Sequence, residues 1–165
     1  MSHSLILGVT GSGKTTLAKH IAKRLKRVIV FATYKSDWQC FHFTDNVSEL
    51  VSIVETNKRL NIFIDEAGES LKRNDKEFQF LATRTRHFGH NVFFITQRAN
   101  QLTPNIRTNC ESLYCFKQSF NDASVLAQEF ADETIMKVTE LPKFYFYEKP
   151  FGCQVGKFKK VEKYF

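Results

Sequence analysis

The sequence predicts an α/β fold built on a doubly wound, mainly parallel β-sheet. Short, almost uninterrupted apolar runs of strand length recur along the chain, and segments with apolar residues at helical spacing separate them. Strands and helices that alternate in this way form parallel sheets with right-handed crossovers. With 165 residues, 42% of them hydrophobic and including seventeen phenylalanines, the chain can bury the core of one domain over residues 1–165.

The individual elements follow from local patterns. Five apolar runs predict buried strands, at residues 5–7, 27–33, 60–66, 91–97 and 112–116, the third of which ends in two acids. Helical spacing of apolar residues predicts helices at 17–25, 47–54, 75–87 and 122–130, and Asn46 is a suitable cap for the second of these. Residues 38–43 alternate aromatic and polar side chains, which favours a short edge strand, and a loop passes through Pro104.

The C-terminal region differs from this pattern. Residues 144–148 and 156–161 read as two strands joined through Pro150-Phe151-Gly152. We therefore expect an antiparallel hairpin at the edge of the sheet. The domain would consist of a core over about 4–120 and a C-terminal helix and basic hairpin over about 121–165.

The segment Gly8–Thr15 matches the phosphate-loop pattern G-x-x-x-x-G-K-[ST] at every fixed position. The predicted strand before it and the predicted helix after it provide the setting that this motif requires. Glycines allow the backbone to turn its N–H groups toward an anion at the positive end of the helix dipole. The residues expected to bind a nucleotide are Gly8, Thr10, Gly11, Ser12, Gly13, Lys14, Thr15 and Thr16.

Two side chains of this loop have specific expected roles. Lys14 would reach the β- and γ-phosphates of ATP, and the Thr15 hydroxyl would ligate the Mg²⁺ ion that bridges them. Thr16 lies outside the invariant pattern and can equally cap the helix or pack. A chance glycine-rich turn is the alternative for the whole motif, and the flanking strand and helix argue against it.

Polar residues follow two of the predicted strands where ligands bind in parallel sheets, at the carboxyl ends. Asp65 is placed to hold Mg²⁺ through its water shell, and Glu66 to orient and deprotonate the water that attacks the γ-phosphate. The alternative is that this pair only caps the next turn. A base directly after the magnesium ligand is typical of RecA-like P-loop NTPases of the ASCE class. Gln97 ends the next strand and could contact both the γ-phosphate and the attacking water.

The segment from Arg86 to Asn109 resembles the HerA/FtsK superfamily of ring-forming, DNA-translocating ATPases. The likeness is greatest to the genome-packaging ATPases of tailless, membrane-containing icosahedral viruses. Arg86, three residues before Gly89, precedes the strand that ends in Gln97, and a basic–x–Asn element follows at Arg107 and Asn109. The resemblance covers about residues 4–120.

This resemblance implies a set of partners. Arg86 would act as an arginine finger on the nucleotide of a neighbouring subunit, and Arg84 is the alternative finger. The protein would form a homo-oligomeric ring of five or six subunits that translocates DNA. Capsid-vertex or viral membrane proteins would dock it, in the cytoplasm of the host cell or at the packaging vertex of a virion.

The charge distribution is compatible with a polyanionic partner. The net charge is +7, and residues 1–35 carry seven bases and no acid. Candidate DNA contacts are Lys72, Arg73, Lys157, Lys159 and Lys160. The alternative is that these lysines, like those of the first helix, only solvate the surface.

The sequence also carries signals about cellular context. No apolar run approaches the roughly eighteen residues of a membrane span, and Met1-Ser2-His3 leads directly into the first strand without a signal peptide. We therefore expect an intracellular protein without a transmembrane segment. The four cysteines lack the spacing of a zinc site and are expected to be reduced thiols.

Two other functions share some of these motifs. A small-molecule or nucleoside kinase would have a phosphate loop and an arginine-bearing lid, which residues 83–90 could imitate. Kinases must exclude water, however, so Glu66 and Gln97 would be poorly explained. A filamentous-phage assembly or export ATPase shares most motifs but usually carries a membrane anchor. The DNA motor is therefore the preferred interpretation.

Overall fold

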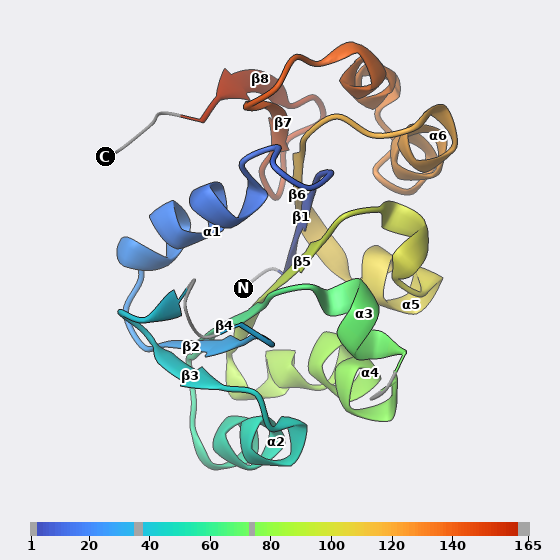
Figure 1. Ribbon diagram of the computed structural model, residues 1–165. Coiled ribbons are helices and arrows are strands. Elements are labelled where there is room, and N and C mark those ends of the chain that lie inside the picture. The colour runs from blue at the N-terminus through green and yellow to red at the C-terminus, as the bar shows by residue number, and fades with distance from the viewer. Residues whose placement is uncertain (1–2, 35–37, 73–74, 162–165) are drawn as a thin grey trace.

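The computed structural model describes residues 3–34, 38–72 and 75–161, and it has the predicted α/β architecture (Figure 1). One eight-stranded sheet has the order β3-β2-β4-β5-β1-β6-β7-β8. Pairing is parallel from β3 to β6, and β7 and β8 join in antiparallel fashion. The strands are β1 (His3–Leu7), β2 (Val28–Phe31), β3 (His42–Thr44), β4 (Asn61–Ile64), β5 (Asn91–Thr96), β6 (Cys110–Cys115), β7 (Tyr145–Lys149) and β8 (Lys157–Lys160).

Helices cover both faces of the sheet, but unequally. The α-helices are α1 (Lys14–Lys23), α2 (Val47–Thr56), α3 (Ala67–Leu71), α4 (Asp75–Thr83), α5 (Pro104–Thr108) and α6 (Phe120–Glu129). Short 3₁₀ segments are η2 (Thr85–Phe88), η3 (Ala99–Gln101) and η4 (Glu133–Glu140). Helix α1 lies on one side of the sheet, and α2 to α6 lie on the other (Figure 1).

The alternation of side chains along the strands creates two separate core layers. On β1, Leu5 and Leu7 pack with α2 to α6, whereas Ile6 packs with α1 and with Trp38. Because successive strand residues point to opposite faces, a strand covered on both faces is apolar throughout. This explains why the strands could be recognised as uninterrupted apolar runs.

Strand β5 lies between β1 and β4, which is the topological fact that assembles the site. Leu7 pairs with Thr96 and Ile64 pairs with Phe94, so the three strands end at nearly the same level. The loops that follow these strands therefore meet at one edge of the sheet, where ligands bind in open α/β folds.

The predicted helix over residues 75–87 is wrong over its last four residues. Helix α4 ends at Thr83, and residues Thr85–Phe88 form the separate 3₁₀ segment η2. Thr85 is fully buried, and its hydroxyl donates to the carbonyl of Leu81. Gly89, at φ 78°, then turns the chain into β5. A buried threonine and a left-handed glycine thus redirect the chain before the strand begins.

Two loop predictions also need correction. Only His42–Thr44 forms the edge strand expected over residues 38–43, because Trp38 is buried in a turn instead of lying in the pleat. The loop through Pro104 contains helix α5, with Pro104 in its first turn, where a missing N–H has no cost. The Asn46 cap is confirmed, since its side chain accepts from the N–H groups of Ser48 and Glu49.

The predicted antiparallel hairpin is confirmed, and a buried polar network attaches it to the domain. The Tyr147 hydroxyl donates to Oδ2 of Asp132 at 2.6 Å, and the Gly156 N–H donates to the same hydroxyl at 2.6 Å. The ammonium group of Lys149 lies 3.4 Å from that carboxylate. Burial, together with the Asp132 hydrogen bond, raises the pKa of Tyr147 to about 12. Such a satisfied buried network fixes the hairpin in one position.

Two buried histidines connect neighbouring strands at their amino ends, away from the phosphate loop. Nδ1 of His3 accepts from the Val92 N–H at 3.2 Å, and Nδ1 of His90 accepts from the Leu60 N–H at 2.9 Å. Burial, assisted by the nearby Arg86 charge, lowers the pKa of His3 from 6.5 to about 4. Burial also lowers the pKa of His90. Both rings therefore serve as neutral acceptors at neutral pH.

This arrangement predicts a loss of stability in mild acid. Because the folded pKa of His3 lies below its unfolded value, the unfolded state binds more protons between about pH 4 and 6.5, and stability falls as the pH is lowered through this window. The complete titration corresponds to about 3 kcal/mol of unfolding free energy. Urea unfolding at pH 7.5, 6 and 5 measures this slope.

His3→Asn provides the control, because an asparagine oxygen can take the Nδ1 position and does not titrate. The variant should show a shallower pH dependence than the wild type, with the remaining slope due largely to His90. Equal slopes for the two proteins would show that His3 is not the responsible group.

Candidate nucleotide site

The phosphate loop adopts a conformation that only glycine supports at two positions. Gly11 has φ 75° and Gly13, the residue before α1, has φ 105°. Gly8 is closely packed, because a Cβ atom there would lie 2.8 Å from Cβ of Phe116. The Gly8 N–H donates to the carbonyl of Thr96 at 3.2 Å, which ties the loop to the end of β5. The loop is therefore held in place by its backbone.

The loop and the start of α1 fit a phosphate chain. Gly13 provides no side-chain cap, so the first N–H groups of the helix have no side-chain acceptor at this residue, and the first turn contains no acid. Ser12 is buried, and its hydroxyl has no hydrogen-bond partner. A bound anion could accept hydrogen bonds from these backbone N–H groups and from the Ser12 hydroxyl.

The two loop side chains with expected roles meet the two acidic residues in one small cavity. Lys14, Thr15, Asp65 and Glu66 line a space of about 50 Å³, together with residues 32–34. Lys14 is buried, as is Asp65, whereas Thr16 is exposed. The hydroxyl of Thr15 and the carboxylate of Asp65 are oxygen ligands of the kind that Mg²⁺ prefers. The residues present therefore fit a magnesium ion as well as a nucleotide.

Trp38 orients the Asp65 carboxylate, a role that the sequence analysis missed. The indole Nε1–H of Trp38 donates to Oδ2 of Asp65 at 2.8 Å, and the Glu66 N–H donates to Oδ1 at 3.0 Å. Trp38 itself is held between Phe41 and Phe63. The only local signal was that the chain's single tryptophan follows the second strand. Its partner is 27 residues away in the sequence.

Glu66 lies in the left-handed region of backbone conformation, at φ 51° and ψ 42°. This conformation costs a residue with a side chain roughly 1–2 kcal/mol. It lets β4 end abruptly and turns Glu66 to line both the small cavity and an open cleft of about 420 Å³ beside it. Backbone strain of this kind is often found at functional sites.

Gln97 directly follows β5 and so lies between the phosphate loop and the two acids. Its carbonyl accepts from the Gln118 side chain at 2.9 Å. The next residue, Arg98, pairs with the buried carboxylate of Asp122 at 3.0 Å, and the Asn100 N–H donates to the same group. Helix α6 thus anchors the loop that carries Gln97, while the Gln97 side chain is only partly buried.

The arginine candidates lie far from this cavity within the same chain. Arg86 is near the start of β5 and β6, at the edge of the sheet opposite the phosphate loop, where it pairs with Glu111 at 3.1 Å and donates to the carbonyl of Asn109. Arg84 is exposed, with no ion pair to any described residue. Arg107 is buried and binds Glu129 with two nitrogens, so it stabilises the α5–α6 packing.

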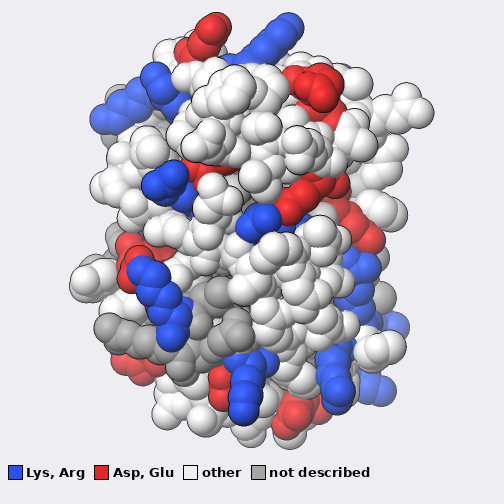
Figure 2. Space-filling model, turned by 90° about the vertical axis from the view of Figure 1, so that its right-hand side faces the viewer, with Lys and Arg blue, Asp and Glu red and all other residues white. Residues whose placement is uncertain are grey.

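The candidate DNA contacts are dispersed. Lys72 is exposed and pairs with Glu69 at 3.1 Å, and Arg73 lies outside the described residues. Figure 2 shows the face that carries α3 to α6, where acidic and basic side chains are intermingled and not gathered by sign. The described residues of this face therefore provide no continuous basic surface.

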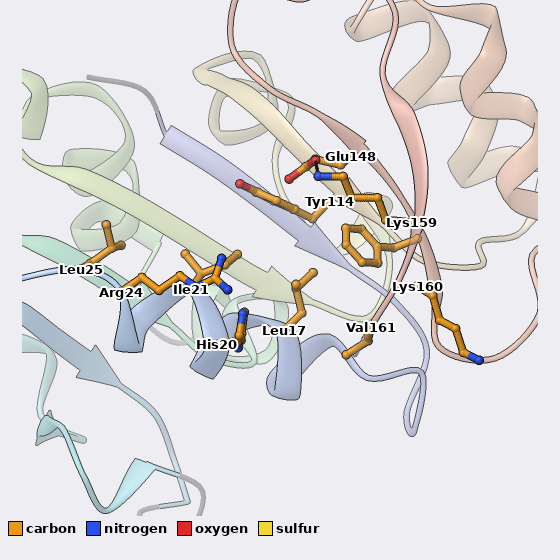
Figure 3. A pocket seen from close by; sticks show the side chains of 11 residues that line it. Leu17, His20, Ile21, Arg24, Leu25, Tyr114, Glu148, Lys159, Lys160 and Val161 are labelled. Atoms are coloured by element: carbon orange, nitrogen blue, oxygen red, sulfur yellow. Dashed lines mark ion pairs between the residues drawn. The ribbon is translucent and has the colours of Figure 1, made fainter. Parts of the chain in front are cut away.

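Two of the hairpin lysines, Lys159 and Lys160, line a groove of about 510 Å³ between α1 and strands β6 to β8 (Figure 3). Lys159 pairs with Glu148 in this groove, whereas Lys160 points away from that pair and lies 5.5 Å from the Tyr145 ring centre. Lys157 is exposed. Arg24 of α1 also lines the groove, so basic groups border it from two elements.

This geometry agrees with the family to which the sequence can be assigned. Residues 2–141 match the family described as Novel STAND NTPase 3. The chain belongs to this NTPase family. The phosphate loop and the Asp-Glu pair do not by themselves distinguish this family, because they occur in many NTPases. No curated protein matches the chain in sequence.

Solved structures share the fold of this NTPase over nearly its whole length. The DNA-packaging ATPase B204 of Sulfolobus turreted icosahedral virus has a TM-score of 0.75 at 17% identity, covering 98% of both chains. The genome packaging NTPase B204 of Sulfolobus turreted icosahedral virus 2, in complex with AMPPCP, scores 0.73 at 19% identity, covering 96% of both. The expected resemblance to packaging ATPases is thereby confirmed at the level of the fold.

A third similar structure comes from a conjugation system. The pCW3 conjugation coupling protein TcpA, in a monomer form with ATPγS, scores 0.72 at 18% identity, covering 96% of this chain and 59% of TcpA. In the described part of this NTPase, no helix combines the length and apolarity needed to cross a bilayer.

The contact between Trp38 and Asp65 generates a prediction about metal binding. Trp38→Phe keeps an aromatic ring beside Phe63 but removes the indole donor to Oδ2, so the Asp65 carboxylate would be held less firmly. Partners of metal ligands typically change metal affinity by about 10–100-fold. The Mg²⁺ concentration that gives half-maximal nucleotide hydrolysis should therefore rise by about tenfold.

Phe41→Leu is the control, because it alters the packing around Trp38 without removing the hydrogen bond. An unchanged Mg²⁺ requirement in Trp38→Phe, with normal folding, would show that Asp65 does not depend on the indole.

Proposed function

We propose that this NTPase is an ATP-driven DNA translocase that packages a viral genome as a homo-oligomeric ring. The observation that carries the proposal is the cavity that Lys14, Asp65 and Glu66 line, with Gln97 following the strand that lies between those of the phosphate loop and the acids. This arrangement suits hydrolysis by an activated water. The similarity to B204 over 96–98% of both chains supports the packaging role.

Each residue of the site has a distinct part in this proposal. Bound ATP supplies the phosphoanhydride bond that is cleaved, and Mg²⁺ neutralises phosphate charge. Thr15 and Asp65 would hold the ion, and Lys14 would neutralise the β- and γ-phosphates. Glu66 takes the proton of the attacking water, and Gln97 orients that water. The kinase alternative gives no role to this water-activating pair.

The charges around the site support the proposed ring. Among the described residues that line the cavities beside Glu66, Lys14 is the only cation, and Asp45 and Glu69 add negative charge. Arg84 and Arg86 lie at the other edge of the sheet, roughly 15 Å away over the length of β1. We infer that Arg86, or Arg84, completes the site of a neighbouring subunit.

The partners and location follow from the packaging role. DNA is the substrate that moves, and its phosphates would be bound by Lys72, Lys157, Lys159 and Lys160, with Arg73 as a further candidate. Docking to a capsid vertex or to viral membrane proteins would place the ring at a packaging vertex, in the cytoplasm of the host.

The first prediction for this function concerns turnover. Glu66→Gln should retain ATP binding and lose about 10²–10⁴-fold in hydrolysis, because the amide keeps the shape of the side chain but cannot accept the proton. Duplex DNA should stimulate the wild-type rate. Phosphate release with and without DNA measures both effects, and light scattering of Glu66→Gln with ATP and DNA measures the oligomer.

Glu55→Gln is the matched control, since it makes the same change in an exposed side chain of α2 that lines neither cavity. Lys14→Ala should abolish ATP binding.

DNA affinity should fall with salt, and Lys160→Gln should reduce the slope of log K against log salt by about one. Phosphate transfer to a nucleoside, or hydrolysis by a monomer that ignores DNA, would contradict the translocase.

The second prediction concerns Arg86. Arg86→Ala should bind ATP but lose about 10³–10⁵-fold in turnover, as expected for an arginine finger that acts on a neighbouring subunit. Loss of its pair with Glu111 should cost only about 1 kcal/mol of stability. Mixing Arg86→Ala with Glu66→Gln should restore part of the activity, because some interfaces then combine an intact Arg86 with an intact Glu66.

Arg84→Ala provides the comparison, because Arg84 is exposed and unpaired with any described residue. If Arg84→Ala shows the large loss and Arg86→Ala does not, Arg84 is the finger. Absence of rescue in rings that demonstrably contain both variants would overturn action between subunits.

A further inference from the structure

A second hollow adjoins the phosphate loop on the side that faces β6 and β7. It has a volume of about 250 Å³ and a mostly apolar lining. The loop contributes residues 9–12, and the other wall consists of Phe116, Lys117 and residues 141–145. Apart from residues of the phosphate loop, none of the predicted site residues lines this pocket.

The order of the strands determines which part of a nucleotide could reach the pocket. Asp65 and Glu66 follow β4, and β1 separates β4 and β5 from β6 and β7 in the sheet. The γ-phosphate must lie on the β4 side, where the base and the metal ligand are. The opposite end of the nucleotide must then extend across the phosphate loop toward β6 and β7, where the pocket lies.

The segment before β7 is packed directly against the phosphate loop. A Cβ atom at Gly13 would lie 3.2 Å from Cδ1 of Phe144, and one at Gly11 would lie 3.9 Å from Nζ of Lys143. The Val161 N–H donates to the Phe144 carbonyl at 2.8 Å, so the end of the hairpin supports this segment. The contact with Phe144 therefore also favours glycine at position 13.

The pocket has the character of a base-binding site. The partly buried Phe144 provides apolar ring surface, beside the fully buried Phe116, and Lys143 is exposed with its ammonium 5.2 Å from the Phe144 ring centre. The unpartnered hydroxyl of buried Ser12 belongs to the same lining. Ligand pockets typically combine such apolar walls with a few polar groups.

We propose that this pocket binds the nucleobase and ribose of the nucleotide, with Phe144 as its principal wall and Lys143 positioned over the phosphate loop. The proposal rests on the nucleotide-hydrolysing function above. Because the lining is mostly apolar, the base is held by contact area more than by hydrogen bonds. The C-terminal hairpin, predicted as a DNA contact, would thus also form part of the nucleotide site.

A ligand without a base separates this proposal from the function on which it rests. Calorimetry would measure the binding of Mg·ATP and of Mg·tripolyphosphate to proteins that carry Glu66→Gln, so that neither ligand is hydrolysed. Phe144→Ala should weaken ATP binding tenfold or more and change tripolyphosphate binding less than twofold. Phe151→Ala is the matched control, because Phe151 is an exposed hairpin phenylalanine outside the pocket.

The outcomes are distinguishable. An equal loss for both ligands would show that Phe144 only supports the loop, and an unchanged ATP affinity would place the base elsewhere. Either result overturns the base pocket. If Phe144→Ala does not fold, Phe144→Leu keeps the packing on Gly13 and removes the ring for the same comparison. If Lys14→Ala binds both ligands normally, the phosphate loop itself is misassigned, whatever Phe144 does.

Discussion

The alignment of three parallel strand ends is the constraint on which the site depends. Hydrogen bonding between β4, β5 and β1 fixes their relative register, and the Gly8 N–H bond to Thr96 extends this register into the phosphate loop. Because the three strands end at nearly the same level, the polar side chains that follow them can lie close together. Any change that shifted β5 would separate Gln97 from both the loop and the acids.

The side chains at these strand ends are held by contacts from outside the sheet. Trp38 fixes Asp65 from one core layer, and Asp122 of α6 anchors the loop after Gln97 from the other. Glu66 is held in a strained left-handed conformation. The domain thus uses some of its folding free energy to orient a few polar groups, as preorganised sites generally do.

The carboxyl ends and the amino ends of the parallel strands carry different groups. The edge with the phosphate loop carries the acids and the loop's cradle of N–H groups, whereas the opposite edge holds buried neutral histidines and the paired Arg86. In a ring, the carboxyl ends of the strands of one subunit could face the amino ends of the strands of its neighbour. Arg86 of one subunit would then lie near the phosphate loop of the next. In the proposed function, hydrolysis then requires two subunits, one with the phosphate loop and one with the arginine. The hairpin lies beside the phosphate loop, so the proposed base contacts and DNA contacts are close to each other.

The sequence by itself determined the elements whose signals are local. Gly8–Thr15 predicts a phosphate loop, because the backbone conformation of such a loop depends on where its glycines stand. The apolar runs predict buried strands, because parallel strands are covered on both faces. Only the tertiary structure decided the rest. It placed Trp38 on Asp65, ended α4 before Arg86, and packed Phe144 against Gly13. These partners lie 27 or more residues apart or depend on a buried turn, and no periodicity in a sequence records which distant residues will meet.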